Sequence, residues 1–166
     1  MRNRLIALAA GLGLAGAAAA QAPVVIDGHV PFADDRSIQR KVREECTQLN
    51  TQLPQFVLEF APASNVEVRV GDASADSGRV LRMVITQAIS QGNAFIGHAK
   101  SSSVRGDLYE DGQHVAGFDA TRNSMGGAFA GYKGSCSVLG RTMRALGRDI
   151  AQWLANPVDG AELGDR

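Results

Sequence analysis

The sequence predicts a two-layer α+β domain in which an antiparallel-rich sheet, with the element order β-α-β-β-β-β-α, carries two helices on one face. Two segments place apolar residues every three or four positions, which is the spacing of an amphipathic helix. Five further segments alternate apolar and polar residues or are short apolar runs, as strands do. One cysteine lies on each helical stripe, so the sequence also predicts a disulfide between the two helices.

The first twenty residues have the pattern of a bacterial signal peptide. Arg2 and Arg4 precede an uncharged run rich in Leu, Ala and Gly that ends in three alanines. We therefore expect cleavage after Ala20, a single domain over residues 21–156 and a polar, frayed tail over 157–166. An uncleaved N-terminal anchor is the alternative, which the short run and its small residues disfavour.

Position 17 bears on the location of the protein. The stretch from Leu14 to Ala17 resembles a lipoprotein cleavage box, except that Ala17 stands where the lipid-bearing cysteine must be. The sequence therefore predicts a periplasmic or secreted bacterial protein that is not a lipoprotein and does not insert into the membrane after cleavage. Without residues 1–20 the chain has 15 basic and 17 acidic side chains and no polybasic run. Neither nucleic acid nor an anionic membrane surface is a favoured partner for such a chain.

Both expected helices carry a cysteine on the apolar face. The first stripe begins at Ile38 and ends at Phe60, with apolar residues at steps of 4, 4, 3, 4, 3 and 4. Pro54 lies inside it, so we expect a kink or a division into two helices at that residue. The second stripe begins at Cys136 and repeats in steps of 3, 4, 3, 4 and 3. Cys46 and Cys136 lie on faces that meet over a core, and in an exported chain two cysteines are most simply one disulfide.

Before and between the helices, the apolar period changes from about 3.6 to 2 residues. The run 80–89 is apolar on both faces, which is typical of a central strand. The other expected strands are 24–32, 66–70, 98–109 and 114–122.

The last two strands flank Glu110-Asp111-Gly112, which predicts a hairpin. A three-residue loop with Gly112 in the left-handed conformation would pair Val104 with Phe118. A two-residue loop would instead set Val104 opposite Asp119, on the wrong face, so the three-residue loop is preferred.

The element order, on an exported chain of this length, resembles the small envelope domains of the curli-secretion lipoprotein family. It also resembles the N-terminal domain of the Tol–Pal propeller protein and several uncharacterised outer-membrane-associated lipoprotein families. The resemblance covers about residues 24–155 and consists of element order, without a diagnostic motif. It implies an accessory or binding role in the cell envelope, without chemistry. The missing lipid-bearing cysteine departs from the lipoprotein pattern.

Candidate metal ligands gather around the hairpin. Asp107, Asp111 and His114 are close in sequence and of types that bind zinc or another divalent ion. The chain has no HxH, HExxH or Cys/His spacing, and acidic hairpin tips are usually solvated turns, so we expect no metal and no cofactor. A small hydrolase or metal-dependent enzyme would use His98 or His114 with nearby acids, although a GxSxG elbow is absent.

The most unusual segment joins the last expected strand to the second helix. It contains four glycines and two aromatic residues within nine positions. It is either a mobile connection whose glycines satisfy awkward backbone angles, or a docking loop with two aromatic anchors for a partner. Glycine-rich loops before a helix can also cradle phosphate, although the Walker and GxGxxG patterns are absent. The candidate docking residues are Gly126, Gly127, Phe129, Gly131, Tyr132, Lys133 and Gly134.

Two hypotheses of different classes follow. The favoured one is an exported, non-catalytic binding or envelope-assembly accessory protein, which docks on an unidentified envelope protein through the glycine-rich loop or an exposed sheet edge. The alternative is a small periplasmic hydrolase or metal-dependent enzyme. No complete active-site pattern is found in the sequence, so the first hypothesis is preferred, and the oligomeric state stays open.

Overall fold

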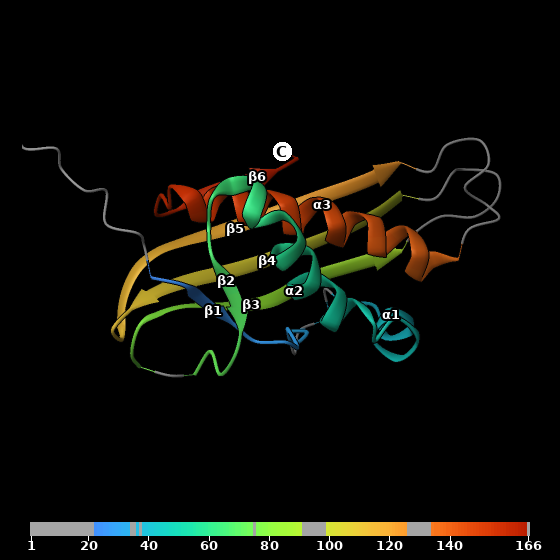
Figure 1. Cartoon of the computed structure of the whole chain (residues 1–166). Helices are drawn as coiled ribbons and strands as arrows, with labels where there is room; N and C mark the ends of the chain where they lie inside the picture. The colour runs from blue at the N-terminus through green and yellow to red at the C-terminus, as the bar shows by residue number, and fades with distance from the viewer. Residues whose placement is uncertain are drawn as a thin grey trace, which may run out of the picture.

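The described residues form a six-stranded mixed sheet with α2 and α3 packed on one face (Figure 1). The computed structural model describes residues 22–33, 36, 38–74, 76–90, 99–125 and 134–165. The strand order across the sheet is β2-β1-β3-β4-β5-β6. In chain order the elements are β1 (Val24–Ile26), α1 (Arg40–Glu45), α2 (Leu49–Phe60), the 3-10 turn η1 (Pro62–Ser64), β2 (Val68–Val70), β3 (Arg79–Ser90), β4 (Ala99–Glu110), β5 (Gln113–Met125), α3 (Ser135–Ala155) and β6 (Ala161–Gly164).

This architecture confirms the predicted α+β class. The long strands β3, β4 and β5 pair antiparallel, whereas β1 runs parallel to both β2 and β3, and β6 runs parallel to β5. Helices separate β1 from β2 and β5 from β6, and each of these two crossovers returns the chain to the same end of the sheet, which makes both pairs parallel. The sheet is therefore mixed and has one strand more than the sequence predicted.

The core lies between the sheet and the helix pair. Ser102, Val104 and Leu108 alternate along β4 on the inward face, and each of them is fully buried. Burial of each large apolar side chain contributes about 1.5–3 kcal/mol, so this layer is the main stabilising feature. The helices contribute Leu49, Leu53 and Val57 from α2, and Leu139, Met143, Leu146 and Ile150 from α3.

The first helical stripe divides before the residue at which we expected a break. α1 ends and α2 begins before Pro54, which lies inside α2. Pro54 has no N–H to bond the carbonyl of Asn50, four residues earlier. That carbonyl instead accepts the N–H of Val30 at 2.9 Å, and the Asn50 side chain donates to the Val30 carbonyl at 2.7 Å. The helix continues through the proline because a neighbouring segment uses the freed carbonyl.

The hairpin between β4 and β5 has a different register from the predicted one. Asp111 and Gly112 form a two-residue turn with φ values of 48° and 78°, the left-handed values of a tight hairpin turn. Val115 then forms a bulge, so Val104 lies opposite Ala120, which is neither of the two partners considered. The bulge keeps the apolar residues of both strands on the inward face, as the alternation requires.

Residues 161–165 are bound to the sheet, and the prediction of a frayed tail is wrong for β6. This strand pairs with β5 along its whole length. The carboxylate of the next residue, Asp165, accepts hydrogen bonds from the backbone N–H of Asn123 and from the Arg122 guanidinium, both at 2.7 Å. The N–H bond first, and then the Arg122 charge, hold the pKa of Asp165 below its usual value. The polar tail is therefore bound to β5 at two points.

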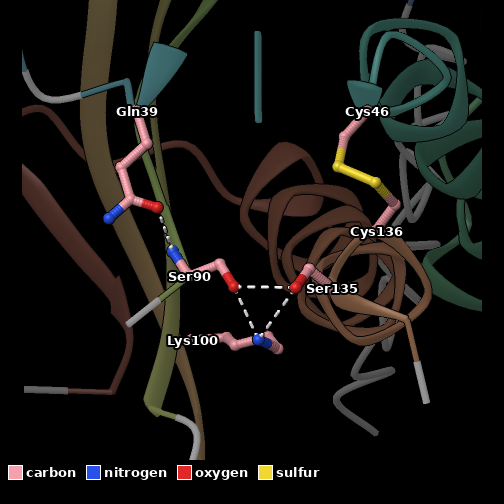
Figure 2. The surroundings of a disulfide bond; sticks show 6 residues. All are labelled: Gln39, Cys46, Ser90, Lys100, Ser135 and Cys136. Carbon is pink, nitrogen blue, oxygen red and sulfur yellow. Dashed lines mark hydrogen bonds between the residues drawn. A yellow bond between two sulfur atoms is a disulfide. The ribbon is translucent and has the colours of Figure 1, made fainter. Parts of the chain in front are cut away.

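The predicted Cys46–Cys136 disulfide is present, and the two Cα atoms are 5.2 Å apart (Figure 2). Cys46 follows α1 directly, and Cys136 lies in the first turn of α3. The bridge therefore fixes the start of α3 against the segment that precedes α2. Bridged sulfurs do not act as nucleophiles, so neither cysteine is a candidate for thiol chemistry.

Candidate functional site

A polar cluster lies at one end of the sheet, near the disulfide (Figure 2). Ser90 is the last residue of β3, Lys100 lies near the start of β4, and Ser135 is the first residue of α3. Antiparallel pairing sets Ser90 opposite Lys100, and Lys100 opposite the end of β5. The elements that residues 91–98 and 126–133 connect therefore meet at this cluster, although these two connections lie outside the described residues.

Hydrogen bonds join the three side chains in a triangle. The Lys100 ammonium donates to Ser90 Oγ at 2.6 Å and to Ser135 Oγ at 3.4 Å. The Ser90 hydroxyl donates to Ser135 Oγ at 3.0 Å. Gln39 Oε1 accepts the backbone N–H of Ser90 at 2.9 Å, which holds the end of β3 in place. The triangle thus links the ends of three elements that are distant in the sequence.

Lys100 is a buried cation. It is 3% exposed, because it lies on the inward face of β4 with Ser102 and Val104. Burial lowers the pKa of Lys100 from its usual value, since the charged form loses its hydration. Within the described residues, no carboxylate forms an ion pair with this ammonium, and its side-chain partners are two neutral hydroxyls.

The N-terminus of α3 adds to the positive character of this end. α3 has 21 residues, no acidic residue in its first turn and no side-chain cap. The N–H groups of Ser135 and Cys136 have no acceptor inside the helix, and the helix dipole places about half a positive elementary charge there. The cluster therefore brings together hydrogen-bond donors and positive potential on a base that the disulfide holds rigid.

Of the predicted docking residues, the structure describes Gly134 alone. Gly134 precedes α3 with φ −55° and ψ 145°, values that any residue adopts. The docking role of residues 126–134 stays a prediction. The structure describes the polar cluster at the start of α3, where this segment ends. The other predicted residues, Gly126, Gly127, Phe129, Gly131, Tyr132 and Lys133, lie outside the described residues, as does His98.

The structure brings together two of the three candidate metal ligands that the sequence analysis considered. Asp107 and His114 are neighbours, with Oδ1 and Nε2 3.2 Å apart, and both are partly exposed to solvent. Asp111 accepts the backbone N–H of Gly78 at 2.8 Å and so supports a neighbouring turn. Among the residues that the structure describes, no three His, Cys, Asp or Glu side chains are grouped closely enough to hold a metal ion.

Sequence reasoning missed Lys100 and Ser90. A signal for Lys100 was present, because the alternation that turns Val104 and Leu108 inward also turns Lys100 inward. Lysine is almost never fully buried unless it is paired, so this position could have been singled out. Its proximity to Ser135, 35 residues away in the sequence, depends on the packing of α3 on the sheet.

Solved structures share this fold, whereas no family model and no curated protein matches the chain. The minor lipoprotein from Acinetobacter baumannii matches with a TM-score of 0.52 and 10% identity, over 84% of this chain and 97% of that one. A DUF330 protein from Xanthomonas campestris matches with a TM-score of 0.59 and 10% identity, over 81% and 84%. Lipoprotein GNA1162 from Neisseria meningitidis has a TM-score of 0.45 and 12% identity, over 78% and 98%.

At these identities the likeness establishes the fold alone. The chain has an α+β fold that also occurs in a bacterial lipoprotein and in a DUF330 protein, and this is compatible with a non-catalytic envelope protein. The comparison supports the predicted resemblance at that coarse level. It does not single out the curli-secretion or Tol–Pal families.

The same comparison corrects our prediction of location. We predicted a periplasmic or secreted protein that is not a lipoprotein, from the alanine at position 17. The minor lipoprotein has this fold over nearly its whole length, so the fold occurs in a lipoprotein, and this finding contradicts that prediction. Among the described helices, none has both the length and the apolar character needed to cross a membrane.

Proposed function

We propose that the protein is a non-catalytic accessory of the bacterial cell envelope, which captures an envelope protein through residues 126–134. The observation that supports this most is the rigid base on which the segment stands. Hydrogen bonds from Lys100 join the ends of β3 and α3, and the disulfide secures the first turn of α3. Binding loops on a rigid scaffold are common, because the scaffold limits the entropy lost on binding.

The position of the other chain end also supports this proposal. Ala22, the first described residue, lies beside Glu67 and Arg79, where β3 begins. β3 runs from there to Ser90, so the polar cluster lies at the opposite end of the sheet (Figure 1). Attachment on the N-terminal side would leave the end with the cluster free to meet a partner.

A photoreactive residue in place of Phe129 tests the proposal in cells. We expect one dominant cross-linked adduct with an envelope protein. Adding Tyr132→Ala should remove most of that adduct, because truncation of an aromatic anchor costs about 2 kcal/mol or more of binding free energy.

The matched control places the same photoreactive residue at Arg141, which is exposed on α3. This position should give no corresponding adduct. Equal adducts from both positions, or an adduct that Tyr132→Ala leaves unchanged, would contradict a docking role for the segment.

A further inference from the structure

The triangle of Lys100, Ser90 and Ser135 contains one hydroxyl proton, that of Ser135, which the triangle itself does not use. Ser135 Oγ accepts from both the Lys100 ammonium and the Ser90 hydroxyl, so its two lone pairs are engaged. Its own proton has no acceptor among the described residues. Ser135 is exposed, whereas Lys100 behind it is buried. The cluster thus contains an exposed serine whose hydroxyl is polarised by the buried ammonium that donates to it.

The same cluster concentrates positive charge without a counter-ion in the described part of the chain. A buried ammonium without a carboxylate partner is costly, and the first turn of α3 adds further positive potential beside it. Arg122, another cation on the inward face, shows the usual arrangement, because Asp149 and Asp165 both pair with it. An anion from outside the chain would offset the charge of the buried ammonium and accept hydrogen bonds from the Ser135 hydroxyl and from the first N–H groups of α3, which have no acceptor inside the helix.

We propose that Lys100, Ser135 and the first turn of α3 bind a phosphate group, either of free phosphate or of a phospholipid headgroup. A phosphate accepts several hydrogen bonds, and a helix N-terminus next to a basic side chain is a recurrent way to hold one. The Ser135 hydroxyl and the N–H groups of Ser135 and Cys136 supply the hydrogen bonds. Lys100 supplies the charge behind them, and Ser90 holds Lys100 in position. This site goes beyond the proposed capture of a protein and does not depend on it.

Calorimetric titration of the mature chain with inorganic phosphate tests the site. Lys100→Met removes the charge and keeps a long side chain, and we expect it to weaken phosphate binding by about tenfold or more. Ser135→Ala removes the serine hydroxyl and leaves the buried lysine, so it should weaken phosphate binding even if Lys100→Met fails to fold. Arg69→Met, which removes an exposed charge from β2, is the matched control and should bind phosphate as the wild type does.

Vesicles of phosphatidylglycerol distinguish the two sources of phosphate. Vesicle binding that Lys100→Met abolishes and free phosphate displaces identifies a lipid headgroup. Saturable phosphate binding without vesicle binding identifies a soluble ligand, and either result supports the site. The proposal is overturned by the absence of saturable binding to both probes, or by equal phosphate affinities in the wild type and in folded Lys100→Met and Ser135→Ala variants.

Discussion

Two cations on the inward face of the sheet, Lys100 and Arg122, have opposite electrostatic surroundings. Arg122 donates to the Asp149 carboxylate at 2.7 and 2.9 Å and to Asp165 at 2.7 Å. The hydrogen bond with Asp149, opposed in part by burial, raises the pKa of Arg122 above its ordinary value. Burial without a carboxylate partner lowers the pKa of Lys100. The fold therefore pairs the partly buried Arg122 with two carboxylates and leaves the buried Lys100 to hydroxyl groups.

We expect Arg122→Ala to lower the free energy of unfolding by about 3 kcal/mol, because it leaves the largely buried Asp149 carboxylate without its partner. Chemical denaturation measures this loss. The control is Arg105→Ala, which breaks an ion pair with Asp119 whose side chains are 58% and 63% exposed. That substitution should cost less than about 1 kcal/mol. Similar losses of unfolding free energy in both variants would show that the Arg122–Asp149 pair contributes no more to stability than an exposed ion pair.

At the scale of elements, α2 and α3 pack closely because a glycine lies where they meet. A Cβ atom added at Gly147 of α3 would lie 2.5 Å from Cβ of Phe56 and 3.0 Å from the backbone nitrogen of Val57. One turn away, the Arg144 guanidinium bonds Glu59 of α2 and lies over the rings of two phenylalanines of that helix. The contact between the helices therefore includes backbone as well as side chains.

Gly147→Ala should destabilise the protein by about 1–3 kcal/mol, because the backbone of α2 must move to admit the methyl group. This loss outweighs the gain of about 1 kcal/mol in helix propensity. Gly140→Ala in the same helix is the control, since its methyl group would meet the end of the Gln52 side chain. It should leave the melting temperature unchanged or raise it. A rise in melting temperature for both variants would show that α2 and α3 can move apart without a loss of stability.

At the scale of the whole molecule, the disulfide joins residues 90 positions apart. The bridge holds the first turn of α3 at the end of the protein where the polar cluster lies. In the chain-entropy model, a disulfide that closes a loop of this length stabilises the folded state by about 4 kcal/mol. It does so because the bridged unfolded chain has fewer conformations than the open one. This is a large share of the stability of a small domain.

Replacement of both cysteines, Cys46→Ser with Cys136→Ser, should lower the free energy of unfolding by about 4 kcal/mol. Urea unfolding with and without a reductant checks this expectation. The reductant should bring the wild type down to the stability of the double variant and leave the variant unchanged. A reductant effect on the variant, or none on the wild type, would contradict this account of the bridge.

Local periodicity shows how much of the fold could be predicted. The apolar stripes predict α2 and α3, and alternation predicts the inward faces of β4 and β5, because both patterns involve residues a few positions apart. The disulfide followed from the same stripes, each of which carries one cysteine. The candidate site could be predicted from the sequence only in part. Alternation turns Lys100 inward, whereas the docking role of residues around Phe129 remains a prediction.

The sequence by itself determined the helical and strand faces and the pairing of the cysteines, and the tertiary structure decided which distant groups meet. Pro54 stays helical because Val30 takes the carbonyl that proline leaves free. The tail becomes a strand because β5 offers an edge and Arg122 binds Asp165. The hairpin register depends on the bulge at Val115, and alternation alone permits a shift in either direction. For Pro54 and for the tail, the deciding hydrogen bond or ion pair forms across space, between residues that no local pattern connects.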